Sequence, residues 1–209
     1  MSKISPLAFI DPEAKIGENC EIGPFCFIDK NVEIGDNNVL MNSVSVLYGA
    51  RIGNGNVIFP GAVISAVPQD LKFRGEETTA EVGDNNKIRE NVTINRGTAA
   101  KGKTCVGSGN LLMESVHVAH DAFVGNDCII GNGTKLAGEI IIDDHAIISA
   151  NVLMHQFCRV GGYTMVGGGT RFSQDIPPYT CTRAGCLLRS ESCRITTERL
   201  QQRTDRKHT

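Results

Sequence analysis

Three residues able to support a proton transfer recur along the chain at intervals of 18: His120, Gly138 and Gln156. Histidine titrates near neutral pH, so His120 is a candidate general base that removes the proton of a hydroxyl group. Asp121 follows it directly and supplies a carboxylate. Glycine allows close approach to its backbone, so the Gly138 N–H is a candidate donor to a developing oxyanion. Stacked together, these residues would form a site for transferring a group to a hydroxyl.

Other histidines leave two further interpretations open. His117 and His155 lie in the same part of the chain and, with His120, could act as three metal ligands that converge across an interface. No ligand spacing is diagnostic of a metal, so we expect none. The other interpretation is that these histidines face solvent at corners and have no chemical role. The chain shows no nucleophile motif, phosphate-binding loop or dinucleotide fingerprint, which favours direct transfer without a covalent enzyme intermediate.

A six-residue repeat is the element that would stack these residues. Every sixth residue from Ile4 to Phe172 gives 29 positions, of which 26 are Ile, Leu, Val, Met or Phe. The exceptions are Ala100 and the polar Asp70 and Glu76. Helices and ordinary strands have periods of 3.6 and 2, so a period of six predicts an all-β fold, the parallel β-helix. Three repeats make one triangular coil of about 18 residues, with one aliphatic side chain pointing inward per repeat.

Composition and charge narrow the class further. Aromatic residues make up 5% of the chain and Gly reaches 23 residues, which suits a narrow aliphatic interior with tight corners. The formal net charge of −2 divides into −6 for residues 1–179 and +4 for residues 180–209. The positive charge of residues 180–209 is too small and too scattered along the segment to indicate nucleic-acid binding. No apolar run matches a membrane span or the core of a signal peptide. We therefore expect a cytoplasmic protein without membrane insertion.

The cysteines follow the repeat. Cys20, Cys26, Cys128 and Cys158 each stand two residues before an aliphatic repeat position, a slot that Ala and Thr occupy in several other repeats. Small side chains are expected there beside the core, where a free thiol behaves as a small hydrophobe. No CxxC pair occurs in the chain. We expect structural thiols rather than redox centres or metal ligands.

Two interruptions and a change of character organise the chain. The repeat is interrupted near residues 65–81 and near residues 95–105, which predicts two loops on a rigid scaffold, where binding groups often lie. After Tyr179 the repeat ends. Weak helical patterning in residues 180–209 favours a short helical or disordered tail. We expect the flat walls of residues 1–179 to associate as a homotrimer.

Five segments carry longer motifs: Gln69–Glu76 (QDLKFRGE), Ile88–Thr98 (IRENVTINRGT), Gly107–Asp121 (GSGNLLMESVHVAHD), Met154–Cys158 (MHQFC) and Gln174–Tyr179 (QDIPPY). Together they closely resemble the acyl-ACP:UDP-N-acetylglucosamine O-acyltransferases, hexapeptide-repeat enzymes that begin lipid A synthesis. The resemblance covers about residues 7–179. It implies a left-handed coil, a homotrimer and active sites between subunits.

The resemblance also implies a role for each candidate residue. His120 would be the general base that deprotonates the glucosamine 3-hydroxyl, Asp121 would tune or orient it, and the Gly138 N–H would be the oxyanion donor. The family's substrate-contacting positions correspond to Asp70, Lys72, His117, His155 and Gln156. Its acyl-groove positions correspond to Met113, Met165 and Gly168. The glycine at 168 leaves room for a long 3-hydroxyacyl chain.

The implied reaction transfers an (R)-3-hydroxyacyl group from acyl carrier protein to the 3-hydroxyl of UDP-N-acetylglucosamine. The donor is held on the phosphopantetheine of the carrier, and no other cofactor is implied. Docking of the carrier is expected on local basic groups, namely Lys72, Arg74, Lys135 and Arg159. The alternatives are acyl transfer to the amino group of an amino-sugar nucleotide, a carbonic-anhydrase-like metalloenzyme and an inactive scaffold.

Three features depart from the family pattern. Asn95 and Glu139 stand where the family often has histidine. These changes weaken the inference that the two positions make the family's secondary contacts, and they do not affect the assignment of the base. After about residue 179 the sequence does not match the family's helical C-terminal domain, whose arginines meet the nucleotide. We therefore expect weakened nucleotide binding, and with it reduced activity, from this chain.

Overall fold

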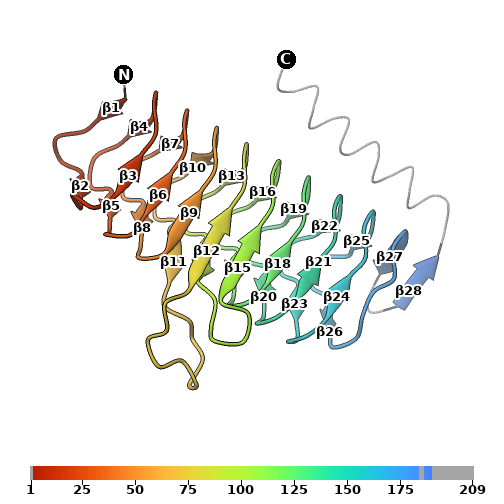
Figure 1. Cartoon of the computed structure of the whole chain (residues 1–209). Coiled ribbons are helices and arrows are strands. Elements are labelled where there is room, and N and C mark those ends of the chain that lie inside the picture. The colour runs from red at the N-terminus through yellow and green to blue at the C-terminus, as the bar shows by residue number, and fades with distance from the viewer. Residues whose placement is uncertain (1, 184–185, 190–209) are drawn as a thin grey trace, which may run out of the picture.

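The computed structural model describes residues 2–183 and 186–189. In this part of the chain, 28 short β-strands stack as successive coils around one narrow core (Figure 1). Each coil supplies one strand to each of three flat parallel walls. The protein is thus a left-handed parallel β-helix, which confirms the all-β fold predicted from the six-residue repeat. The described residues contain no helix that is long and apolar enough to cross a membrane.

The three walls follow the order of the coils. The first wall contains β1 (Lys3–Ile4), β4 (Glu21–Ile22), β7 (Val39–Leu40), β10 (Val57–Ile58), β13 (Lys87–Ile88), β16 (Leu111–Leu112), β19 (Ile129–Ile130), β22 (Ile147–Ile148), β25 (Met165–Val166), β27 (Thr180–Arg183) and β28 (Cys186–Arg189). The second wall contains β2 (Phe9–Ile10), β5 (Phe27–Ile28), β8 (Ser45–Val46), β11 (Val63–Ala66), β14 (Thr93–Asn95), β17 (His117–Val118), β20 (Lys135–Leu136), β23 (Leu153–Met154) and β26 (Arg171–Phe172). The third wall contains β3 (Lys15–Ile16), β6 (Glu33–Ile34), β9 (Ala50–Ile52), β12 (Thr79–Val82), β15 (Lys103–Val106), β18 (Phe123–Val124), β21 (Ile141–Ile142) and β24 (Arg159–Val160).

Strand pairing fixes the spacing of the coils. A strand residue usually pairs with the residue 18 positions further on. Val82 pairs instead with Ile52, 30 positions earlier, and Val106 pairs with Val82, 24 positions earlier. Two insertions therefore leave the coil, as loop 1 (residues 67–78) and loop 2 (residues 96–102). Because they add twelve and six residues to their coils, the six-residue repeat stays in phase through both.

The inward repeat positions form the core. Between residues 22 and 166, every repeat position outside the two loops is at most 4% exposed. Burying one such aliphatic side chain stabilises a fold by about 1.5–3 kcal/mol. Ile4, at the open N-terminal end of the coil, is 47% exposed. The three exceptions to the repeat, Asp70, Glu76 and Ala100, all lie in the loops, so none of them faces the core.

A ladder of buried amides runs past both insertions. Asn38, Asn56, Asn86 and Asn110 occupy one corner in four successive coils and are at most 1% exposed. Each side-chain oxygen accepts the backbone N–H of the corner residue in the next coil at 2.7–2.9 Å, ending at Cys128. A buried polar group is costly unless it is hydrogen-bonded, so this satisfied column holds the coils in one register.

The cysteines of the small slot are buried, as the repeat predicted. Cys20, Cys26, Cys128 and Cys158 are at most 3% exposed and carry free thiols. Burial raises the pKa of Cys128 to about 12. This thiol therefore stays neutral at physiological pH and contributes as a small apolar group.

Residues 180–183 and 186–189 form strands, in contrast to the helical or disordered tail that the sequence favoured. β27 adds to the first wall in parallel beside β25 and pairs with β28 as an antiparallel hairpin. Thr180 and Thr182 are buried at 1% and 7% exposure, so packing on the last coil overrides a weak helical pattern. Residues 190–209, on which the rest of the predicted tail falls, lie outside the described residues.

Ile141 and Ile142 test the inward phase of the repeat, because they are neighbours on β21. Ile142 is fully buried in the core, whereas Ile141 is half-buried on the outer face of the wall. We expect Ile142→Ala to lower the free energy of unfolding by about 2–5 kcal/mol, since it leaves a cavity. Ile141→Ala is the matched control and should cost clearly less. Urea unfolding at one protein concentration measures both, and equal losses would contradict the assigned phase.

Candidate active site

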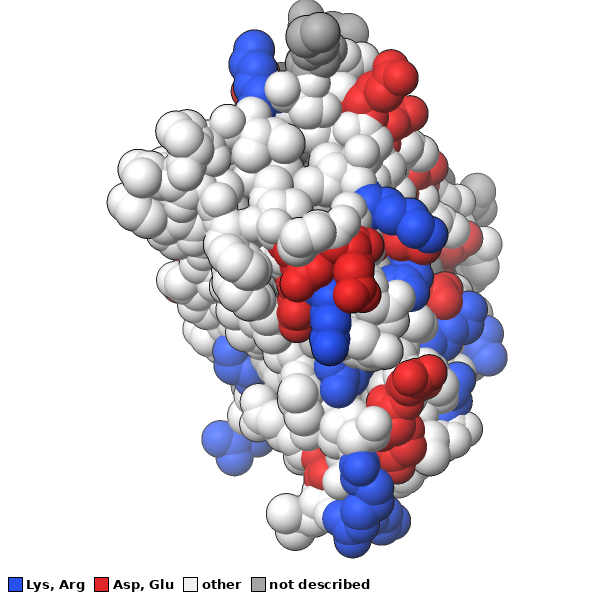
Figure 2. Space-filling view, turned by 60° about the vertical axis from the view of Figure 1, so that its left-hand side comes forward, with Lys and Arg blue, Asp and Glu red and all other residues white. Residues whose placement is uncertain are grey.

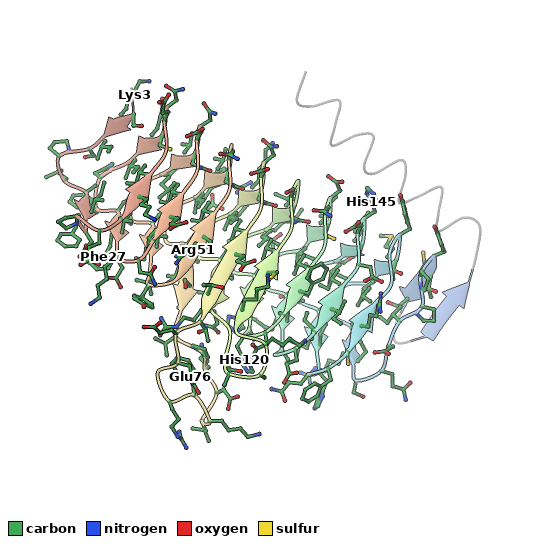
Figure 3. The ribbon with its side chains drawn as sticks, viewed as in Figure 1. Lys3, Phe27, Arg51, Glu76, His120 and His145 are labelled. Atoms are coloured by element: carbon green, nitrogen blue, oxygen red, sulfur yellow. The ribbon has the colours of Figure 1, made fainter. Side chains whose placement is uncertain are left out.

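Both loops and the candidate catalytic residues share one edge of the coil. This edge, between the second and third walls, is called the site edge here. In five successive coils it carries residues 67–78, 96–102, 119–122, 137–140 and 155–158. Figure 1 shows the two loops leaving the coil on the same side, and Figure 3 shows His120 beside them.

Successive corners of the site edge stack as the spacing of 18 predicted. The Glu139 N–H donates to the His120 carbonyl at 3.0 Å, and the Phe157 N–H donates to the Gly138 carbonyl at 3.3 Å. The His120 ring lies directly against Gly138, because a Cβ built there would be 2.6 Å from Cε1 and 2.7 Å from Nε2. Only glycine leaves room for the imidazole in this position. Gln156 lies at the corner of the next coil.

His120 and Asp121 form a buried pair. Nδ1 of His120 lies 2.8 Å from Oδ2 of Asp121, and the two residues are 6% and 1% exposed. An ionised carboxylate only accepts hydrogen bonds, so Nδ1 of the neutral ring carries the proton and donates it to Asp121. Nε2 is then the unprotonated nitrogen, and it lies beside Gly138. The arrangement is that of a general base whose tautomer is set by a carboxylate.

A threonine from loop 2 completes the surroundings of Asp121. Thr98 donates its backbone N–H to Oδ1 at 2.9 Å and its hydroxyl to Oδ2 at 2.6 Å. Burial by itself would raise the pKa of Asp121, but the hydrogen bonds from Thr98 and His120 outweigh it and hold that pKa below its ordinary value. Thr98 is not among the candidate residues predicted from the sequence, where it only ends the motif Ile88–Thr98. The signal that could have pointed to it is the interruption of the repeat just before the coil of His120.

His117 lies on the outer face of the second wall, between Thr93 and Lys135 in the neighbouring coils. Its Nδ1 is 2.7 Å from the Thr93 hydroxyl. Desolvation lowers the pKa of His117, and the nearby Lys135 and His120 lower it further by repulsion. The ring is therefore neutral at physiological pH and available for hydrogen bonding to a ligand.

The other predicted substrate residues lie along the same edge without bonding to His120. His155 and Gln156 are exposed at the corner that follows Gly138. Asp70 and Lys72 belong to loop 1, where the Asp70 carboxylate accepts the Lys72 backbone N–H at 2.9 Å. Within the described part of one chain, no hydrogen bond joins either loop residue to His120.

The predicted acyl-groove residues lie elsewhere on the molecule. Met165 is on β25 and faces outward from the first wall, since Val166 beside it is buried. Met113 and Gly168 lie at the edge between the first and second walls. Within one chain, the second wall therefore separates Met113 and Gly168 from the site edge, and Met165 lies on the wall opposite that edge.

The basic groups predicted to dock a carrier protein differ in their surroundings. Lys72 and Arg74 are exposed on loop 1. Arg159 forms an ion pair with Asp143 at 3.0 Å, and the Lys135 ammonium donates to a backbone carbonyl at 2.6 Å. Acidic and basic side chains are interspersed on the face shown in Figure 2. Across the described residues, no three His, Cys, Asp or Glu side chains are grouped so as to hold a metal ion.

Known proteins are similar to this chain in fold and in sequence. An acyl-[acyl-carrier-protein]–UDP-N-acetylglucosamine O-acyltransferase from Aliarcobacter butzleri is 46% identical over 180 residues, which span 86% of this chain and 69% of the relative. A UDP-N-acetylglucosamine acyltransferase from Bacteroides fragilis has a crystal structure that matches with a TM-score of 0.90 and 69% identity, over 95% of this chain and 77% of that one. The Arabidopsis UDP-N-acetylglucosamine acyltransferase matches with a TM-score of 0.79 and 30% identity, over 94% and 76%. No protein-family model matches the chain.

These similarities identify the class and then the family. The hexapeptide coil, with a histidine and an aspartate paired at its edge, places the chain among the hexapeptide-repeat acyltransferases. Within that class, the chain belongs to the family of acyl-[acyl-carrier-protein]–UDP-N-acetylglucosamine O-acyltransferases. The resemblance predicted from the sequence motifs is confirmed.

The lowered pKa of His117 can be tested by titration. We expect its NMR titration, assigned with His117→Gln, to have a midpoint below the ordinary value of about 6.5. Because the pKa is lower in the folded state, the stability contributed by the neutral ring is present above about pH 6.5 and lost as the pH falls through the folded pKa. The stability difference between wild type and His117→Gln should shrink over that range. A midpoint above 6.5 would contradict the burial of this ring.

Gly138→Ala tests the contact between Gly138 and His120. The new Cβ would meet a side chain, so we expect the variant to fold while the imidazole moves and its NMR signals shift. In Gly161→Ala, the matched control, the Cβ would lie 2.4 Å from the Pro178 backbone nitrogen. That variant should lose thermal stability and leave the His120 signals in place. Unchanged His120 signals in Gly138→Ala would refute the stacking.

Proposed function

We propose that the chain transfers an (R)-3-hydroxyacyl group from acyl carrier protein to the 3-hydroxyl of UDP-N-acetylglucosamine, the first step of lipid A biosynthesis. The observation that carries this proposal is the His120 ring, held by Asp121 and stacked against Gly138 at the site edge. The activity named for the relatives supplies the substrates.

The reaction follows from the geometry of three groups. Nε2 of His120 accepts the proton of the sugar hydroxyl as that oxygen attacks the thioester carbonyl carbon. Asp121 accepts from Nδ1–H throughout and stabilises the imidazolium that forms. The Gly138 N–H has no acceptor among the described residues and donates to the oxyanion of the tetrahedral intermediate. Collapse of the intermediate breaks the carbon–sulfur bond, and the imidazolium returns its proton to the departing thiolate.

The substrate contacts in this proposal come from the site edge and the wall beside it. Gln156 and His155 lie at the following corner and His117 on the adjoining wall, which favours contact with the sugar nucleotide. We assign Asp70 to the sugar as well, and Lys72 to the acyl or phosphopantetheine end. No cofactor beyond the phosphopantetheine of the carrier takes part in this scheme. The cytoplasmic location and the weakened nucleotide binding stay predictions.

A homotrimer with active sites between neighbouring copies is part of the proposal. In one chain Met113, Met165 and Gly168 lie away from the site edge of His120, which supports a site built from two copies. The outer face of the first wall carries an aliphatic stripe that a second copy would cover, made of Leu111, Ile129, Ile147 and Met165. A second copy that packs this stripe near the site edge of its neighbour would place an apolar groove beside the base. Sedimentation measurements test the trimer.

His120→Ala tests the function directly. With UDP-N-acetylglucosamine and a series of 3-hydroxyacyl carrier proteins, the wild-type chain should form an O-acyl sugar nucleotide. We expect His120→Ala to lower kcat by about 10²–10⁴-fold, since proton transfer by a positioned base contributes that much. His145→Ala is the matched control, because His145 stacks on Tyr163 at a different edge. Equal activity of wild type and His120→Ala would refute the assignment, and an amide product would point to an amino-sugar acceptor.

A further inference from the structure

One residue of loop 2, Thr98, bonds directly to the carboxylate of Asp121. The six extra residues of this coil let the chain leave β14, form a short turn and return to β15. Within that turn Thr98 bonds to both oxygens of Asp121, at 2.9 and 2.6 Å. Thr98 is 7% exposed and Asp121 is 1% exposed, so both bonds are shielded from water. Short charge-assisted bonds in such surroundings are strong and directional.

The direction of the Thr98 hydroxyl is set by the turn itself. The Ala100 N–H donates to Thr98 Oγ1 at 3.2 Å, and the Gly102 N–H donates to the Thr98 carbonyl at 2.7 Å. Because Oγ1 accepts from Ala100, its own proton is left to donate to Asp121. The hydroxyl therefore acts as an oriented donor to the carboxylate.

The carboxylate is in turn held in one orientation. Oδ2 of Asp121 accepts from both the Thr98 hydroxyl and the His120 Nδ1–H, while Oδ1 accepts from the Thr98 N–H. The Asp121 backbone N–H donates to the Thr104 hydroxyl at 2.8 Å, which anchors the corner. Rotation of the carboxylate would break the two bonds to Thr98 together with the bond to His120.

We propose that Thr98 is a positioning residue for the transfer reaction: it holds the Asp121 carboxylate so that His120 keeps its proton on Nδ1 and presents a bare Nε2. The inference rests on the proposed function of His120 as the base. It also gives loop 2 a task, because this insertion brings both Thr98 donors to the Asp121 carboxylate. Thr98 acts through Asp121 and does not itself touch the reacting atoms.

Thr98→Val removes the hydroxyl and keeps the shape and the backbone N–H. We expect kcat to fall about tenfold or more with little change in KM for the sugar nucleotide, since a hydrogen bond to a charged group is lost and binding is not. Thr98→Ser restores the hydroxyl and should recover most of kcat. If Thr98→Val does not fold, Thr98→Ala serves in its place.

The control is a buried threonine far from the site. Thr164 is fully buried and donates to the Pro177 carbonyl at 3.1 Å. Thr164→Val should lower stability and leave kcat unchanged. If it lowers kcat as much as Thr98→Val does, the loss reflects general stability and the positioning role is refuted. A serine variant no better than the valine variant would refute it as well.

A spectroscopic readout separates this inference from the proposed function. Nitrogen-15 NMR of the His120 ring, in protein without substrate, reports which nitrogen carries the proton. We expect the Nδ1–H tautomer in wild type and in Thr98→Ser, and a mixture of tautomers in Thr98→Val. The same single tautomer in all three would overturn the proposal. Absence of transfer activity in wild type would overturn the proposed function, and the tautomer measurement would still decide the role of Thr98.

Discussion

The stacking of one coil directly upon the next is the constraint on which the site depends. Parallel pairing fixes which residue of the next coil lies over a given residue. In a coil without an insertion, a histidine at one corner therefore lies against the residue 18 positions later. At the site edge that residue is Gly138, whose missing side chain makes room for the His120 ring. The buried amide ladder runs along the coils that precede this stack and continues across both insertions.

The chemistry of the site edge depends on a buried carboxylate whose burial is compensated by hydrogen bonds. Asp121 is almost completely removed from water, which disfavours its charge, yet three hydrogen bonds keep it ionised. The ionised carboxylate fixes the tautomer of His120 and directs its free nitrogen toward Gly138. His117 stays neutral on the adjoining wall, because desolvation and the nearby Lys135 lower its pKa. A rigid coil supplies this precision more readily than a mobile loop, because each corner is bonded to the coils before and after it.

Much of this arrangement could be predicted from the sequence, because the six-residue repeat and the 18-residue coil are regular. The repeat identifies the inward side chains, and the spacing of 18 identifies the stack of His120, Gly138 and Gln156. Both insertions are multiples of six, so counting through them keeps the phase. What the sequence does not contain is the path of an irregular segment. The bonds of Thr98 to Asp121 depend on how loop 2 folds, and the pairing of Arg159 with Asp143 depends on which side chains meet across coils. The hairpin of β27 and β28 depends on contact with the last coil, which a local helical pattern does not reveal.

In this mechanism Nε2 of His120 is the atom that receives the proton of the acceptor hydroxyl. A crystal structure of this chain with UDP-N-acetylglucosamine bound would show where that hydroxyl lies. We expect the oxygen on C-3 of the glucosamine to lie about 2.6–3.2 Å from Nε2, with Nδ1 still bonded to Asp121. A nucleotide sugar seated at the site edge with that oxygen beyond hydrogen-bond reach of His120, or seated at another edge of the coil, would contradict it.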